Sequence, residues 1–367
     1  MDASVAGGDG PLVHPALRVL ASLLIMAMLG SCAAPARHRS AVPVRHRARA
    51  ASTSFAARSP GVSVPLGGEV EVDGLAAAGG YLWAYVRDTG VLVRVDQGTG
   101  RARQFGLAAW RGLPTVLAAS ARGVWLADQH SARPDLIRVD PQTGRVVARP
   151  RLPGHVGPIT GLVAAYGWLW VLVPNGAFPP GWRVIRVNPS TNRVDGISAD
   201  TPGTQLTGHT AAISASDGKL WVTESLNVIV SLDPRTLAMH TAATPQLSEG
   251  LVFGDGHAWA LNLGRPRLAE IDPATGRVVR RLVTPAPSAT GDDYVVAGHN
   301  VLWVFRGSHL TELNPGTGQV IKSARVNPIT LAFYSPNSLA VIVSTGLWYL
   351  AQTSSGTALN HITTSGT

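Results

Sequence analysis

The sequence holds one cysteine, Cys32, among 367 residues, so a folded domain made from it has no intrachain disulfide. Charged residues make up only 14% of the chain, and lysine occurs only as Lys219 and Lys322. The longest apolar run, Val19 to Leu29, is shorter than the about 20 residues that a membrane-spanning helix requires. The repeated part of the chain has no helical period of 3.6 residues. These absences favour one large all-β domain held by packing alone.

Turn-forming residues are abundant in the chain, whereas charged residues are few. Glycine and proline together contribute 66 residues, or 18% of the chain, against an average of about 12%. They lack the fixed period of collagen, and apolar residues at 45% suffice for a core. The composition therefore indicates a globular domain with many tight turns.

Residues 1–32 are predicted to be a targeting segment. Arg18 precedes the apolar run, which has the length of a signal-peptide core, and Leu29-Gly30-Ser31-Cys32 ends it. Small residues before the cysteine resemble the lipobox of bacterial lipoproteins. That resemblance implies that Cys32 becomes the acylated N-terminus and holds the protein on the extracytoplasmic face of the cell membrane. A plain signal peptide, or an uncleaved anchor with an incidental cysteine, remains the alternative.

Residues 33–60 are predicted to be a disordered tether rich in Arg, Ala and Pro, because such a composition cannot bury enough apolar area to fold. The tether carries six arginines and no acidic residue. Attraction to anionic headgroups is one interpretation, and a plain soluble spacer is the favoured one. Much of the formal charge of +9 lies in this arm, since residues 61–367 keep 24 positive and 20 negative side chains. Nucleic acid is not an expected partner, because basic and aromatic residues do not interleave.

Residues 61–367 contain a repeat marked by a tight turn of the form Asp/Asn-Pro-x-Thr-Gly. The first residues of successive turns are 44, 48, 45, 39 and 42 positions apart. Asp or Asn bonds the backbone of its own turn, proline fixes φ, and glycine accepts positive φ. The six turns begin at Asp96, Asp140, Asn188, Asp233, Asp272 and Asn314.

A tryptophan opens a strand upstream of each turn, and four short strands fit in each repeat. These residues are Trp83, Trp125, Trp170, Trp221, Trp259 and Trp303. A sheet of four short strands cannot cover both of its faces, whereas radial stacking of such sheets does. The sequence therefore predicts a seven-bladed β-propeller of four-stranded antiparallel blades, with the six tryptophans packed between blades.

The seventh copy is degenerate. We expect Leu339-Ala340-Val341 to replace its tryptophan strand, with Leu347 to Leu350 as the next strand and Ser354-Ser355-Gly356 as its turn. Two ways of closing the ring stay open: the segment Val62 to Val72 adds an outer strand to the last blade, or that blade is complete by itself.

The repeat G-x-L-W-V…V-D-P-x-T-G-R-V resembles that of the YVTN, NHL and virginiamycin B lyase-like group of seven-bladed bacterial propellers. Asp-x-x-Thr-Gly also resembles quinoprotein repeats, but Val278 or Ile321 stands where those place a tryptophan. The Gly-His and Trp-Asp pairs of WD40 repeats are absent. The resemblance covers about 300 residues and implies the fold rather than an activity.

In a meander, the Asp-Pro and Gly-Asp-Gly turns share one face, and the less regular loops share the other. Binding residues concentrate on irregular loops carried by a rigid scaffold. Carboxylates and histidine near the channel mouth on that loop face could ligate Ca²⁺ or Mg²⁺, or stay ordinary solvated side chains. The candidate ligands are Glu249, Asp292, Asp293, Glu224 and His209.

The lyase-like group implies a Mg²⁺ site of Glu and His, and Trp221-x-Thr223-Glu224 matches its form once. No serine nucleophile motif and no Cys/His metal spacing occurs, so no catalytic or cofactor-binding residue is assigned. The favoured interpretation is therefore a binding or scaffold module without a cofactor, for a protein, peptide or glycan ligand. The alternative is a cation-dependent lyase or lactonase, or a quinoprotein-like enzyme.

Overall fold

The computed structural model describes one propeller domain. The described residues are 62–113, 115–128, 135–153, 158–175, 181–201, 212–225, 228–243, 251–262, 267–284, 293–326 and 340–363. Contacts divide the chain into two units, Met1–Thr53 and Ser54–Thr367, and every described residue belongs to the second. Within the described residues, none of the helices has the length and apolarity needed to cross a bilayer.

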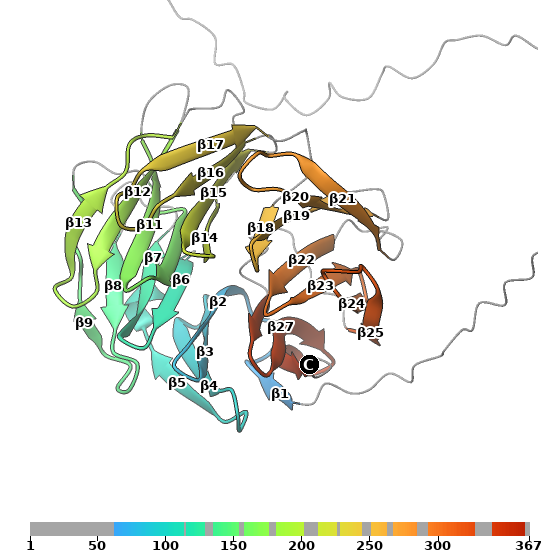
Figure 1. The fold of residues 1–367 in the computed structure, drawn as a ribbon. Helices are drawn as coiled ribbons and strands as arrows, with labels where there is room; N and C mark the ends of the chain where they lie inside the picture. Colours follow the sequence, from blue (N-terminus) through green and yellow to red (C-terminus); the bar gives the residue numbers. More distant parts are fainter. Residues whose placement is uncertain are drawn as a thin grey trace, which may run out of the picture. The chain divides into compact units, whose positions relative to one another are not determined.

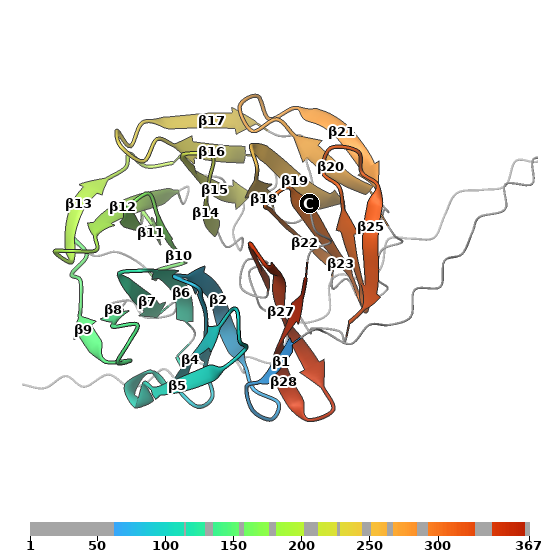
Figure 2. The same ribbon diagram turned by 60° about the horizontal axis from the view of Figure 1, so that its bottom comes forward.

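Seven four-stranded antiparallel sheets stand in a ring, as Figures 1 and 2 show. The predicted seven-bladed propeller is therefore confirmed. In blades 1 to 6 the chain runs from the innermost strand to the outermost one. Blade 1 is β2 (Val72–Ala78), β3 (Tyr81–Val86), β4 (Val91–Asp96) and β5 (Ala102–Gly106). Blade 2 is β6 (Thr115–Ser120), β7 (Gly123–Asp128), β8 (Leu136–Val139) and β9 (Val146–Ala148).

The next four blades repeat this order. Blade 3 is β10 (Gly161–Ala165), β11 (Trp168–Pro174), β12 (Trp182–Asn188) and β13 (Arg193–Ile197). Blade 4 is β14 (Ala212–Ser216), β15 (Lys219–Ser225), β16 (Val228–Leu232) and β17 (Met239–Ala243). Blade 5 is β18 (Leu251–Gly254), β19 (His257–Asn262), β20 (Arg267–Ile271) and β21 (Val278–Val283). Blade 6 is β22 (Asp293–Gly298), β23 (Val301–Arg306), β24 (His309–Leu313) and β25 (Val320–Arg325).

Blade 7 joins the two ends of the propeller. Its order from the channel outward is β26 (Ala340–Val343), β27 (Gly346–Thr353), β28 (Gly356–Ile362) and β1 (Val62–Pro65). Val62 pairs with His361, and Pro65 pairs with Ala358. Of the two predicted ways of closing the ring, the first is confirmed, because the N-terminal segment supplies the outer strand.

The predicted frame of the seventh copy is wrong. Ala340 and Val341 belong to the inner strand β26, and Trp348 lies in the second strand, where the other blades have their tryptophan. The turn at Ser354 and Ser355 joins the second and third strands rather than the third and fourth. The third-to-fourth turn does not exist in blade 7, because its fourth strand comes from the other end of the domain.

The tryptophans lie between neighbouring blades, as predicted. Trp83 of blade 1, for example, packs in one apolar cluster with Leu117 and Val124 of blade 2. Each indole of the six predicted positions is 4% exposed or less, and Trp348 is fully buried. Since each blade covers the face of the next, the core is a ring of inter-blade clusters rather than one central core.

A basic side chain ties each of blades 1 to 6 to the next blade. In blades 1 to 3 this residue lies on the third strand, directly opposite the tryptophan. In blades 4 to 6 it lies on the fourth strand, opposite the third-strand residue that pairs with the tryptophan. Each of the six meets a backbone carbonyl near the turn-face end of the following blade. The pairs are Arg94 to Pro141, Arg138 to Pro189, Arg186 to Pro234, His240 to Ala274, Arg280 to Pro315, and Lys322 to Thr363.

Candidate functional site

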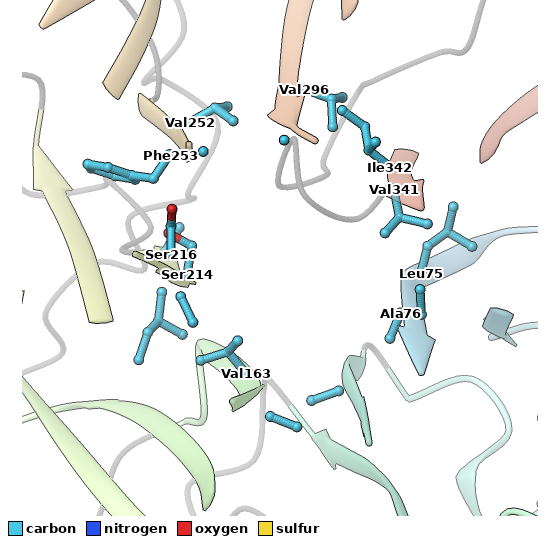
Figure 3. A pocket seen from close by; sticks show the side chains of 18 of the residues that line it. Leu75, Ala76, Val163, Ser214, Ser216, Val252, Phe253, Val296, Val341 and Ile342 are labelled. Carbon is cyan, nitrogen blue, oxygen red and sulfur yellow. The ribbon is translucent and has the colours of Figure 1, made fainter. Parts of the chain in front are cut away.

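The inner strands of all seven blades enclose a central channel. A cavity of about 580 Å³ occupies it, lined by small and aliphatic side chains from every blade. Figure 3 shows Leu75, Val163, Val296 and Val341 around this space, with the hydroxyl-bearing Ser214 on one wall. Inner strands pair on one edge only, so their other edge turns backbone N–H and C=O groups toward the channel. The described part of the channel wall therefore offers backbone dipoles rather than charged side chains between its two mouths.

Charged groups in the channel lining gather at the mouth on the face of the Asp-Pro turns, called the turn face below. Asp217 and Asp255 line this mouth together with His299. Asp217 Oδ2 accepts a hydrogen bond from Gly256 N at 2.6 Å, and Asp255 Oδ2 accepts one from Asn300 N at 2.7 Å. Each carboxylate thus fastens the inner turn of its own blade to that of the next, which is a structural role.

The opposite face, called the loop face, carries a charged cluster on blade 1. We define the blade 1 cluster as Glu71, Asp73, Arg87, Asp88 and Thr115. Arg87 Nε donates to both carboxylate oxygens of Asp73 at 2.9 and 3.0 Å, and Arg87 also pairs with Glu71. Asp73 Oδ2 accepts from Thr115 N of blade 2 at 2.9 Å. Asp73 directly precedes Gly74, which lines the channel, so the cluster lies beside the channel mouth.

Loops from three parts of blade 1 meet at this cluster. Asp88 Oδ2 accepts from Glu71 N at 2.8 Å, and Arg111 Nε donates to Asp88 O at 2.7 Å. The short helix η1 (Ala108–Trp110) stands beside them, and the Tyr85 hydroxyl donates to Trp110 O. These bonds fix the loops, so this part of the loop face is a preformed surface.

Burial dominates the acid–base chemistry of the cluster. Asp73 is 6% exposed, and this burial raises the pKa of its carboxyl, although Arg87 and Thr115 N act against the rise. Burial, with the Asp73 charge as a smaller contribution, raises the pKa of Tyr85 to about 12. Asp73 is bonded on both oxygens and Tyr85 stays neutral, so neither group is poised as a catalytic base.

A second fixed loop base lies on the loop face of blade 3. Gly181 N donates to Asn175 Oδ1 at 3.1 Å, and Asn175 N donates to Gly181 O at 2.9 Å. Trp182 N donates to the buried Thr201 hydroxyl at 2.9 Å. Asn175, at the end of β11, and Gly181, at the start of β12, are therefore held together by a closed, hydrogen-bonded base.

Most of the predicted cation ligands lie outside the described part of the chain. This holds for Glu249, Asp292 and His209, and also for the predicted lipid attachment residue Cys32. The backbones of Glu224 and Asp293 are described. Glu224 falls at an irregularity in the pairing of β15 with β16, and Asp293 begins β22 opposite Arg306. In the described ranges, no group of three or more His, Cys, Asp or Glu side chains is placed to hold a metal ion.

Sequence reasoning missed Asp73 and Arg87 as candidate site residues. Asp73 occupies a register irregularity between Val72 and Gly74 of β2, which breaks the alternation of the strand. A charged residue between apolar neighbours at the start of an inner strand was the available signal. It became meaningful only once Thr115 of the next blade was known to lie beside it.

Sequence comparisons identify no relative: no family model and no curated protein matches the chain. Solved structures match its fold. The WD40 repeats of RRP9 give a TM-score of 0.57 at 11% identity over 83% of this chain and 99% of that one. The computationally designed protein Ika8 gives 0.51 at 13% over 82% and 98%. BamB from Moraxella catarrhalis gives 0.48 at 14% over 79% and 85%. At such identities the likeness to RRP9 and Ika8 shows the β-propeller fold alone.

Proposed function

We propose that this protein is a lipid-anchored, extracytoplasmic propeller that binds a protein, peptide or glycan ligand through its loop face without catalysing a reaction. The resemblance of its repeats to those of the YVTN, NHL and virginiamycin B lyase-like group supports this proposal. Cys32 is the proposed attachment point for the lipid.

The difference between the two faces carries this proposal, because the turn face repeats from blade to blade and the described loop face does not. On the turn face, the same bonds recur from blade to blade and tie the blades together. The described loop face has no such repetition, and its blade 1 cluster is rigid and beside the channel mouth. A rigid, non-repeating surface on a structural ring supports recognition. The bonding of Asp73 and Arg87 to one another supports binding over catalysis.

Site-specific photo-crosslinking in the native cell tests the binding face. A photoreactive side chain replaces either Asp88 or Arg111, both exposed on the loop face. The matched control carries it at Arg122, which is exposed on the turn face. We expect a discrete adduct from the loop-face positions only. Adducts from Arg122 alone, or equal adducts from all three, would overturn the assignment.

The competing class is a cation-dependent lyase or lactonase, or a quinoprotein-like enzyme. Native mass spectrometry of the purified protein with added Ca²⁺ or Mg²⁺ separates it from the binding module. The binding module predicts no stoichiometric metal. A bound ion that disappears in Glu249→Ala or Asp293→Ala would support the enzyme instead.

Metabolic labelling with a lipid precursor tests the anchor separately. We expect the wild-type protein to take up label and Cys32→Ala to lose it. Equal labelling of both would remove the anchor while leaving the loop-face proposal untouched.

A further inference from the structure

The outer strands of blades 5 and 6 each expose two aliphatic side chains. Val279 is 59% and Val283 is 75% exposed on β21, while Val320 is 56% and Ile321 is 40% exposed on β25. Single exposed apolar residues are ordinary, but a contiguous group marks an interaction surface.

The two outer strands neighbour one another in Figures 1 and 2. Arg280 of β21 donates to Pro315 O and Gly316 O in the turn before β25. Gly318 packs so closely on Leu282 that a Cβ there would lie 2.7 Å from Leu282 Cδ2. β21 is thus in direct contact with the turn that leads into β25. We call Val279, Arg281, Val283, Val320, Ile321 and Arg325 the blade 5–6 edge.

This edge is basic as well as aliphatic. Arg281 and Arg325 are exposed, and the sequences of β21 and β25, VVRRLV and VIKSAR, contain no acidic residue. The edge therefore offers positive charge and aliphatic side chains together, which complements a surface that is anionic outside and apolar beneath.

The backbone of the edge is unsuited to pairing with another strand. β21 pairs with β20 through a register irregularity between Glu270 and Ile271, and β25 pairs with β24 through one between Glu312 and Leu313. Such bulges sit at Val279 and Ile321, and bulges at sheet edges disfavour strand addition. An extended peptide is therefore a poor occupant.

A second copy of the chain is also a poor occupant. A two-fold contact would place the edge against itself and bring Arg281 and Arg325 close to their own counterparts. With no acidic residue on either strand, that repulsion has no compensation within the edge.

We propose that the blade 5–6 edge lies against the headgroup layer of an anionic phospholipid membrane. The arginines pair with lipid phosphates, and the valines and Ile321 enter the boundary between headgroups and acyl chains. β1, where the tether ends, belongs to the adjacent blade 7, to which blade 6 is joined by Lys322 Nζ and Thr363 O at 2.9 Å. The edge thus neighbours the blade that holds β1, the first strand of the propeller. This inference extends the proposed membrane location but does not depend on Cys32.

Co-sedimentation with vesicles tests the edge. Residues 54–367 contain all the strands of the ring and form one compact unit, so this fragment is used without the targeting segment. The probes are phosphatidylcholine vesicles with and without phosphatidylglycerol. We expect binding only to the anionic vesicles, a loss of about fivefold in partitioning for each of Arg281→Gln and Arg325→Gln, and weakening by added salt.

A matched control comes from blade 2, where Val147 occupies the equivalent bulge of β9 and is 55% exposed. Val147→Ser should leave vesicle binding unchanged, whereas Val283→Ser/Ile321→Ser should weaken it, with circular dichroism confirming that each variant is folded. No binding to anionic vesicles, or equal effects of the edge and control variants, would overturn the proposal. Binding to polyglutamate but not to vesicles would assign the edge to an acidic protein partner and overturn it too. Since the fragment lacks Cys32 and leaves the loop face intact, none of these results bears on the anchor or the ligand face.

Discussion

In each turn between the third and fourth strands of a blade, the side chain of the first residue accepts hydrogen bonds from the turn backbone. Asp96 Oδ1 accepts from Thr99 N at 2.8 Å, from Gly98 N at 3.1 Å and from the Thr99 hydroxyl at 2.9 Å. Bonds of this kind favour the ionised carboxylate and lower the pKa of Asp96, Asp140, Asp233 and Asp272. In blades 3 and 6, Asn188 and Asn314 accept the equivalent backbone bonds without a charge.

These turns predict acid sensitivity. Because the folded pKa lies below the ordinary aspartate value of 3.8, each carboxylate adds stability above that value and loses it as the pH falls through the lowered pKa. Replacing all four aspartates by asparagine should flatten the decline of the urea midpoint in acid. Asn188→Asp should steepen it. Parallel pH profiles for the wild type and both variants would contradict this origin of acid sensitivity.

The arginines that join blades 1 to 3 to their neighbours predict a second residue-scale effect. Arg138 Nη1 donates to Pro189 O at 2.7 Å, and Arg138 Nη2 donates to Arg122 O. A hydrogen bond to a charged group contributes about 2 kcal/mol, so Arg138→Met should lower the free energy of unfolding by about that amount. Arg145→Met, at an exposed position on the same blade, is the control. A similar urea midpoint for the two variants would show that the hydrogen bond between Arg138 and Pro189 does not stabilise the propeller.

At the scale of elements, β1 predicts that the propeller tolerates relocation of its ends. Val62 pairs with His361 near the end of β28, so a short turn after Thr363 can lead directly into β1. A fragment beginning at Glu69 lacks β1 and should lose thermal stability. A permutant that begins at Glu69 and ends with that turn and residues 62–68 should regain it. A permutant no more stable than the fragment would show that β1 is dispensable.

Six blades could be predicted because their chemistry is local. The pairing of Asp140 with Thr143 in one turn, and the reversal at Gly144, fix where two strands end within five residues. Blade 7 has no such marker, since its last strand is supplied from the opposite end. Apolar alternation alone does not distinguish β26 from β27, because neither strand alternates between buried and exposed positions.

The charged cluster of the loop face could not be predicted for a related reason. Asp73 lies in β2 and Arg87 in the turn after β3, and a backbone irregularity at Asp73 directs it toward Thr115 of blade 2. Such a contact arises only from the packing of two blades. The turn face repeats one local motif, so sequence reasoning identified it, whereas each loop-face contact has its own tertiary origin.

At the scale of the whole molecule, closure distinguishes the ring from an open row of repeats. In an open row, each repeat contacts only its neighbours and terminal repeats unfold by themselves. Here blade 7 packs on both blade 6 and blade 1, and Val64, Trp303, Tyr349 and Leu82 share one cluster.

That cluster predicts that a destabilising substitution in blade 7 also destabilises the two flanking blades. Val64 is 5% exposed, so Val64→Asp places a charge in the shared cluster. Hydrogen exchange should accelerate in β2 and β22 of the flanking blades as well as in β1 and β28. Ser63→Asp, at the exposed neighbouring position, is the control. Acceleration confined to β1 and β28 would contradict the cooperative ring.

The pairing of β1 with β28 also determines when blade 7 can close during folding. The segment that completes the last blade is synthesised nearly three hundred residues before its partner, as Val62 and His361 show. Until the C-terminal hairpin emerges, blades 1 and 6 each present an apolar flank to solvent. If the chain crossed a membrane N-terminus first, β1 would remain unpaired until β28, near the C-terminus, had also crossed. Only then would the apolar flanks of blades 1 and 6 be covered.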